Sequence, residues 1–256
     1  YIFEYNLPLS LRQYDLGHTF VVNCAGANGI AHLRSLCRNN RAGGVTCFTS
    51  ADLDAVVTNI FAHEIGHQIA ANHTFSASCN TFQYFVGLEP FCGHSIMSYN
   101  LQDKLPYFHA ISLQNMLTVI RQRSDEGCGT IVPTVENTAP TVTHAHRNGL
   151  YIPIQTPFAL EALGQDADQD SLTYSWEQNN PGENTSLFRM FAPTPNPRRT
   201  FPAMATLLSG QNDPFEVLPT GNQQLNFRCV VRDNHSGGGA VAWTDIEVNT
   251  NANVGP

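Results

Sequence analysis

Residues 63–73 read His-Glu-Ile-Gly-His-Gln-Ile-Ala-Ala-Asn-His. Residues four positions apart lie on the same face of a helix, so His63 and His67 point their imidazoles towards one spot. His73 comes six residues after His67, which is too far for the same face of one continuous helix. The chain must therefore bend to bring the third imidazole round. Three neutral imidazoles and a water molecule make an open tetrahedral zinc site, the arrangement of a catalytic zinc.

Glu64 follows the first histidine of this block directly. The position brings its carboxylate close to a water on the metal without aligning it as a ligand, which suits a general base. The alternative is a chance occurrence of the pattern on an ordinary amphipathic helix, and the third histidine argues against it. Apolar residues at every fourth position predict that the opposite face of the helix is buried: Val57, Phe61, Ile65 and Ile69.

The ends and the small residues of this helix carry two further expectations. Asp52 or Asp54 is suited to cap its N-terminus. Ala62, Gly66 and Ala70 are small, and we expect them to leave room for a substrate backbone near the metal.

The block and its third histidine resemble the metzincin clan of zinc peptidases, whose motif HExxHxxGxxH is followed by a tight turn with a methionine beneath the metal. Residues 95–99, Ser-Ile-Met-Ser-Tyr, supply that turn. The resemblance implies that Met97 forms an apolar floor under the imidazoles. The clan usually has glycine where this chain has Ala70, at the bend of the helix. We therefore expect either a left-handed Ala70, at a cost of roughly 1–2 kcal/mol, or a bend displaced towards Asn72.

Tyr99 stands two residues after Met97 and resembles the tyrosine of astacins and serralysins. That resemblance implies an extra zinc ligand in the resting enzyme, which swings away and helps to stabilise the oxyanion. The other interpretation is a tyrosine in the wall of the cleft, and the sequence leaves both open.

The resemblance extends to residues 14–18, 71–75, 107–109 and 172–178, which look like bacterial reprolysin-like secreted peptidases with an immunoglobulin-like module behind the protease. It implies a twisted, mostly parallel sheet with a zinc-binding helix and a C-terminal helix, followed by an all-β immunoglobulin-like sandwich. Ahead of the zinc helix the sequence predicts three strands and one short helix, near residues 2–5, 18–22, 45–48 and 30–37. The clan has more sheet there, so we expect that an N-terminal part is missing.

A domain boundary is predicted at residues 130–140. Leucine, methionine and isoleucine at helical spacing predict a helix over residues 112–123, which ends at Gly127-Cys128-Gly129. Beyond the boundary, alternating apolar residues predict strands at 141–146, 172–176, 224–232 and 241–248. We therefore expect a protease domain at 1–129, a linker at 130–140 and a β-sandwich at 141–256.

Asp166, Asp168 and Asp170 place three carboxylates at alternate positions of a loop. They repel one another unless a hard cation gathers them, and calcium accepts six to eight oxygen ligands. The glycine and the distal glutamate of an EF-hand are missing. The loop resembles those of cadherin-like and related bacterial modules, which implies Asp233 as a further ligand. A solvated acidic turn is the alternative.

Seven cysteines are typical of an oxidising compartment. Cys79 and Cys92 both lie between the third histidine and Met97, and they are the first predicted disulfide. Cys37 with Cys47, across a glycine-rich turn, is the second. We expect Cys229, in an apolar run, to be a buried free thiol.

Composition excludes several classes of function. The net charge of −8 argues against nucleic acid and anionic membrane surfaces as partners. No apolar run approaches the roughly 18 residues of a membrane-spanning helix. Without a signal peptide, the chain reads as a mature secreted form. The other histidines lack ligand spacing and are interpreted as polar or capping residues, with His94 and His109 near the cleft: His18, His32, His94, His109, His144, His146 and His235.

Together these patterns predict a secreted zinc endopeptidase that acts on protein or peptide substrates, with Glu64 as base and acid. A binding or adhesion protein with a degenerate, metal-holding protease domain is the competing class, and an intact Glu64 argues against it. A thermolysin-like enzyme would take a distant glutamate as third ligand, and His73 and Met97 argue against that. Subsite preference and oligomeric state stay open.

Overall fold

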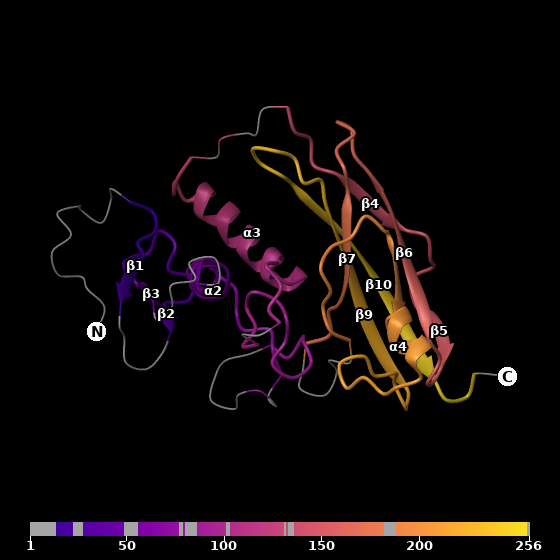
Figure 1. The fold of residues 1–256 in the computed structure, drawn as a ribbon. Helices are drawn as coiled ribbons and strands as arrows, with labels where there is room; N and C mark the ends of the chain where they lie inside the picture. The colour runs from indigo at the N-terminus through magenta and orange to yellow at the C-terminus, as the bar shows by residue number, and fades with distance from the viewer. Residues whose placement is uncertain are drawn as a thin grey trace. The chain divides into compact units, whose positions relative to one another are not determined.

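The computed structural model describes residues 14–22, 28–48, 56–76, 79, 86–100, 103–130, 132, 136–181 and 188–254. The chain divides into two compact units (Figure 1). The first consists of Tyr1–His73 and Ser95–Val132, and the second of Thr74–His94 and Pro133–Pro256. The domain limits expected from the sequence stay a prediction. The strand near residues 2–5 and the caps Asp52 and Asp54 lie outside the described residues.

The first unit contains a small mixed sheet of strand order β1-β3-β2. β1 (Thr19–Val22) runs parallel to β3 (Gly44–Phe48), and β2 (Gly29–Ala31) runs antiparallel to it. The predicted strands near 18–22 and 45–48 are confirmed. The short helix predicted near 30–37 is wrong, because Ile30 pairs with Val45 in the sheet. The pairing with a distant strand outweighs a local helical pattern.

The histidine block lies on α2 (Ala62–Ile69), which continues a π-helical segment, η1 (Val57–Phe61). Among the described residues of α2, the buried ones are His63, Glu64, Gly66 and Gln68. Val57 is 49% exposed. The expected buried apolar stripe is therefore wrong at Val57, whereas Phe61, Ile65 and Ile69 are half-buried and Ile69 packs against the apolar core. The helix also turns its histidine-bearing polar side inwards, where buried polar groups need partners.

Gln68 provides the clearest of these partnerships. Its Nε2 donates to the carbonyl oxygens of Gly17 (2.9 Å) and Arg41 (3.3 Å), so its Oε1 accepts from Nδ1 of His18 at 2.8 Å. The other ring nitrogen of His18 lies 2.9 Å from Oγ1 of Thr46 on β3. Burial lowers the pKa of His18, which keeps the imidazole neutral. This network fastens α2 to the sheet.

The predicted helix at 112–123 is confirmed as α3 (Ala110–Asp125). His109 caps its N-terminus, where the side chain accepts from the backbone N–H of Ile111 at 3.3 Å. The capping role expected of His109 is thus confirmed. Met116 of α3 packs with Ala71, Ile96 and Met97 in the apolar core of this unit.

The second unit is built from two sheets around one core (Figure 1). The first has the order β5-β10-β9-β7 and the second the order β4-β6-β8. Their strands are β4 (Thr141–His144), β5 (Leu150–Pro153), β6 (Phe158–Gln165), β7 (Thr173–Gln178), β8 (Arg198–Phe201), β9 (Gln223–Arg232) and β10 (Val241–Asn251). A short helix, α4 (Met204–Ser209), follows β8. The four predicted strands correspond to β4, β7, β9 and β10.

Alternation along the strands fills the core between the sheets. The most completely buried aromatic residues there are Phe188, Phe201 and Phe227, with Trp176 of β7 at 3% exposure. They pack against aliphatic residues of both sheets: Leu160, Ala162, Leu225, Val231, Ile246 and Val248. This core explains why the region reads as β-rich in the sequence.

Two disulfides join described cysteines. Cys79–Cys92 confirms the first predicted pair. The second predicted pair is wrong, because Cys37 bonds to Cys128, which is 91 residues away in sequence and lies beyond the end of α3. Cys47 is disulfide-bonded as well. Cys229 is free and buried, as expected.

Within the described residues, no helix has the length and the apolar character that crossing a membrane requires.

Candidate metal centre and active site

The three histidines of the block converge. Nε2 of His73 lies 2.9 Å from Nε2 of His67 and 3.2 Å from Nε2 of His63. A tetrahedral zinc with Zn–N bonds of about 2.0–2.1 Å holds its nitrogens about 3.3 Å apart. The separations in this site are close to that value. The predicted ligand set is thus brought to a single point.

Hydrogen bonds fix the tautomers of two of these imidazoles. Nδ1 of His63 lies 2.8 Å from the carbonyl oxygen of Ile96, and Nδ1 of His67 lies 2.7 Å from that of Ala71. A carbonyl oxygen only accepts, so both Nδ1 atoms carry the proton and both Nε2 atoms present lone pairs. A cation at the centre would accept these lone pairs and relieve their repulsion. The donor set therefore fits zinc, with outer hydrogen bonds of the kind that orient metal ligands.

Burial also keeps the imidazoles of His63 and His67 neutral. It lowers the pKa of His63 well below the ordinary value, and the neighbouring His67 and Lys104 lower it further. Burial likewise lowers the pKa of His67. Neutral imidazole is the form that binds a metal.

The chain leaves the helix at Ala70 without the strain that the sequence suggested. Ala70 has a φ of 174°, which is extended backbone, and Asn72 is absent from the described residues with positive φ. The N–H groups of Ala70 and Ala71 both donate to the carbonyl of Gly66 (2.9 and 2.7 Å). The expectation of a left-handed residue at Ala70 or Asn72 is therefore wrong. This turn, closed by two hydrogen bonds to one carbonyl, directs the chain so that His73 lies beside His63 and His67.

Glu64 is 6% exposed, and burial raises its pKa to about 7 although the charge of Lys104 opposes the shift. Its Oε2 is buried and has no hydrogen-bond partner within the described residues. Its Oε1 lies against Gly29 of β2, where an added Cβ would come within 2.4 Å of it. The carboxylate thus packs against the edge strand through Oε1, which leaves Oε2 free to accept a hydrogen bond.

The methionine turn forms as predicted. The N–H of Ser98 donates to the carbonyl of Ser95 at 3.0 Å, and Met97 is fully buried. A Cβ on Gly66 would approach the Met97 sulfur to 2.5 Å. Gly66 therefore makes room for Met97 rather than for a substrate backbone, which corrects that expectation.

Residues 9–127 match the family described as metallo-peptidase family M12B, reprolysin-like. This part of the chain is a reprolysin-like metallopeptidase domain. A comparison with curated proteins gives no match. Among solved structures, AggA, the major subunit of aggregative adherence fimbriae type I from Escherichia coli, is 12% identical, with a TM-score of 0.24. That likeness covers 45% of this chain and 96% of the fimbrial chain, and it is too slight to carry an argument.

In the reprolysin-like domain, Tyr99 lies beside the histidines, with its ring centroid 4.6 Å from that of His73 and 6.0 Å from that of His63. Burial raises the pKa of its phenol, and the charge of Glu64 raises it further. The phenol therefore keeps its proton at neutral pH and can donate a hydrogen bond.

Sequence reasoning missed Lys104 as a residue of this domain's site. Its Nζ donates to the carbonyl oxygens of Asn59 (3.1 Å) and Ile96 (3.0 Å). No motif marks it. The one signal in the sequence is that Lys104 is the only lysine of the chain and follows Met97 by seven residues.

The acidic loop lies in the second unit. Asp166, Asp168 and Asp170 bring carboxylate oxygens within 4.8 Å of one another. Oδ1 of Asp166 accepts from the N–H groups of Asp168 (2.9 Å) and Asp170 (3.1 Å). Its Oδ2 is buried and, among the described residues, without a partner. The same holds for Oδ1 of Asn137, whose neighbour in sequence, Thr138, donates its N–H to Asp168 at 2.5 Å. Two buried acceptors thus lie at this loop.

Asp233 is 1% exposed and belongs to the same region. Its Oδ1 accepts from the N–H groups of Ala240 (2.8 Å) and His235 (3.2 Å), and its Oδ2 accepts from Nδ2 of Asn137 (3.0 Å). Burial raises the pKa of Asp233, but these hydrogen bonds outweigh burial and hold the pKa below its ordinary value. Protein donors already satisfy this carboxylate, and its role as a metal ligand stays a prediction.

Three of the remaining histidines have polar partners, as expected. His18 bonds to Gln68, Nε2 of His146 accepts from the N–H of Glu161 at 3.0 Å, and Nδ1 of His235 lies 2.8 Å from Asp170. His94 is buried, and its backbone N–H donates to the Glu89 carboxylate at 2.7 Å.

Proposed function

We propose that the reprolysin-like domain is a zinc-dependent endopeptidase in which Glu64 serves as general base and then as general acid. The observation that carries the proposal is the convergence of three Nε2 atoms beside a buried carboxylate with an unpartnered oxygen. His63, His67 and His73 would hold the metal. The family match supports protein or peptide substrates.

Zinc, when bound, supplies a Lewis acid that polarises the scissile carbonyl and acidifies a water molecule. Glu64 takes the proton of the attacking water on its available oxygen and returns it to the leaving amine. A carboxylate whose pKa is raised to about 7 is suited to both transfers, because its proton affinity matches the working pH. Gly29, by lacking a side chain, keeps this carboxylate against the edge strand.

Tyr99 is proposed as a hydrogen-bond donor to the developing oxyanion. Its protonated phenol and its place beside His73 support this role. The alternative, a tyrosine that only walls the site, makes no contribution to the rate.

A degenerate domain that only holds metal is the competing function. It has no use for Glu64, whose burial without a partner for Oε2 costs stability. Secretion is proposed as well, since disulfides such as Cys37–Cys128 persist in oxidising compartments.

Metal content measured together with cleavage of a denatured protein tests the proposed function. We expect about one zinc per chain, loss of cleavage on chelation, and recovery on adding zinc back. A chain that retains full cleavage after complete removal of zinc would contradict the proposal.

For the second unit we propose a calcium site at Asp166, Asp168 and Asp170. Calcium prefers carboxylate and amide oxygens, and the buried Asp166 Oδ2 and Asn137 Oδ1 are acceptors of that kind. The bonds within the loop also suit a plain acidic turn, so the response to added calcium decides.

A further inference from the structure

On its outer edge, β7 of the second unit pairs with the segment around Thr194 through only one pair of backbone hydrogen bonds. Tyr174 and Thr194 exchange both backbone bonds, at 2.7 and 3.0 Å. In an antiparallel pair the next such exchange comes two residues further along, between Trp176 and Ala192. It does not form. Among the residues that the structure describes, the N–H of Trp176 has no acceptor on this side.

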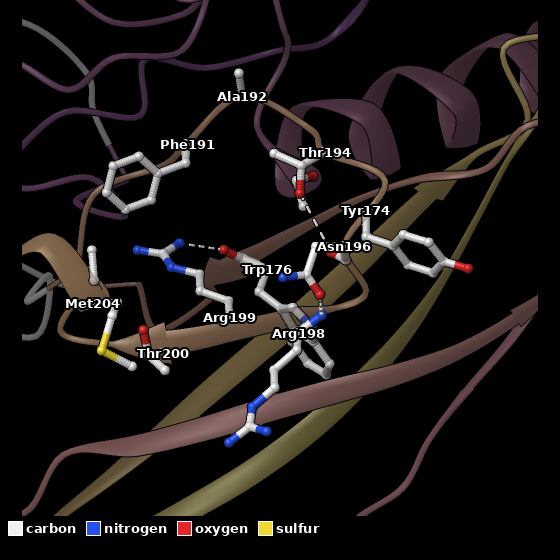
Figure 2. A pocket seen from close by; sticks show the side chains of 12 residues that line it. Tyr174, Trp176, Phe191, Ala192, Thr194, Asn196, Arg198, Arg199, Thr200 and Met204 are labelled. Atoms are coloured by element: carbon white, nitrogen blue, oxygen red, sulfur yellow. Dashed lines mark hydrogen bonds between the residues drawn. The ribbon is translucent and has the colours of Figure 1, made fainter.

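Arg199 of β8 occupies the place of the missing bonds. Its guanidinium donates to the carbonyl of Trp176, to that of Arg189 at 2.8 Å, and to Glu216 at 2.9 Å. The ring centroids of Phe191 and Phe201 lie 4.6 and 4.4 Å from its Cζ. Figure 2 shows this guanidinium below the ring of Phe191, pointing to the main chain of Trp176. These contacts fix the Arg199 side chain in one position.

Arg199 lines a pocket of about 250 Å³ between β7 and the segment after Phe191. Phe191, Ala192 and Met204 give it apolar walls, as Figure 2 shows around the opening. Beyond the pocket, α4 leaves Met204 and Leu208 52% and 80% exposed. Because these two lie one helical turn apart, they extend the apolar surface in one direction.

The donors at this pocket define the chemistry of an occupant. Among the described residues, the backbone N–H of Trp176 has no acceptor, and Nε of Arg199 is buried without one. Arg199 already has Glu216 as counter-ion, so the site does not need a second negative charge. A neutral acceptor, such as a peptide carbonyl, is therefore favoured over a carboxylate.

We propose that this pocket binds an extended peptide segment, with an apolar side chain between Phe191 and Met204 and a main-chain carbonyl on the Trp176 N–H. Adding backbone hydrogen bonds at a sheet edge, with a pocket for one side chain, is a known mode of peptide recognition. The site lies in the unit that does not carry the histidines. It would give the chain a second binding site for a protein, separate from the site of cleavage.

The test uses the full chain with Glu64→Gln, so that added peptides stay intact, and with ¹⁵N-labelled tryptophan. The chain has only Trp176 and Trp243, so the spectrum shows two backbone amides. The probe is the capped peptide acetyl-Gly-Ala-Leu-Ala-Gly-amide. We expect the Trp176 amide to shift saturably during titration while the Trp243 amide stays in place.

Matched variants localise the binding. Ala192 and Ala252 are both exposed, and only Ala192 lines the pocket. Ala192→Phe should weaken peptide binding at least tenfold, and Ala252→Phe should leave it unchanged. Met204→Asp, at a half-exposed wall, repeats the test should Ala192→Phe not fold. A stationary Trp176 amide at several millimolar peptide, equal affinity in Ala192→Phe, or shifts with octanoate but not with peptide would overturn the proposal.

Discussion

His63 and Lys104 donate to the same acceptor, the carbonyl oxygen of Ile96, from 2.8 and 3.0 Å. Lys104 also holds the carbonyl of Asn59 in η1. The only lysine of the chain thus ties the segment before α2 to the methionine turn. Through Ile96 it fixes the orientation of His63, the first of the three proposed metal ligands, as outer hydrogen bonds at metal sites do.

Lys104→Met should therefore weaken zinc binding by about tenfold to a hundredfold, the usual effect of losing such an outer contact. Removing a positive charge near a metal would by itself strengthen zinc binding. The direction of the change in zinc affinity therefore distinguishes a positioning role of Lys104 from a purely electrostatic effect. Competition with a chelator of known affinity measures it. Arg121→Met, which removes an exposed charge, is the control. Unchanged or tighter zinc binding in Lys104→Met would refute the positioning role.

Tyr99→Phe should lower kcat by about tenfold to a hundredfold, which corresponds to about 1.4–2.8 kcal/mol for one donor to an oxyanion. Zinc affinity should hardly change, since three imidazoles remain. Steady-state kinetics on a peptide substrate, with zinc content measured in parallel, give both quantities. An unaltered kcat would leave Tyr99 as a wall of the site.

Calcium should stabilise the second unit. At a hundred times its dissociation constant, a ligand of the folded state adds about 2.7 kcal/mol to the free energy of unfolding. Both tryptophans lie in this unit, so their fluorescence follows its melting in the full chain. Asp168→Asn should abolish the response, and Asp125→Asn in α3 should retain it. Coincident melting curves with and without calcium would leave the loop as a solvated turn.

The stability of the same unit should depend on pH because the Asp233 carboxylate titrates. Its pKa is lowered in the folded state from an ordinary value of 3.8. A carboxylate of this kind contributes stability above its unfolded pKa, and that contribution is lost as the pH falls through the folded pKa. The difference in Tm between the wild type and Asp233→Asn, followed by tryptophan fluorescence, should be full at pH 6 and shrink below pH 3.8. A difference that persists unchanged at pH 2 would show that ionisation of Asp233 is not its source.

The site could be predicted from the sequence where its chemistry is encoded locally. The spacing of His63, His67 and His73 and the turn around Met97 lie within one short stretch, so the sequence predicted their convergence. Gln68 pairs with His18, and Glu64 packs on Gly29, across separations that no local pattern contains. These partners became visible only in the fold.

The same distinction holds for the secondary structure. Alternation predicted β9 and β10, whose register runs from Val241–Arg232 to Thr250–Gln223. The segment after Ile30 read as helix because its spacing is helical, but pairing with β3 decides its conformation. Likewise the apolar residues of α2 predicted a buried stripe, while hydrogen bonds to Gln68 and the histidines turned the polar face inwards.

Glu64→Gln tests the central claim most directly, measured as zinc content and as cleavage of a denatured protein in one preparation. Asp125→Asn, the same chemical change at an exposed position, is the matched control. The account predicts full zinc occupancy and a loss of cleavage of about 10²–10⁴-fold in Glu64→Gln, with neither quantity changed in the control. Near-normal turnover in a zinc-loaded Glu64→Gln enzyme would contradict it.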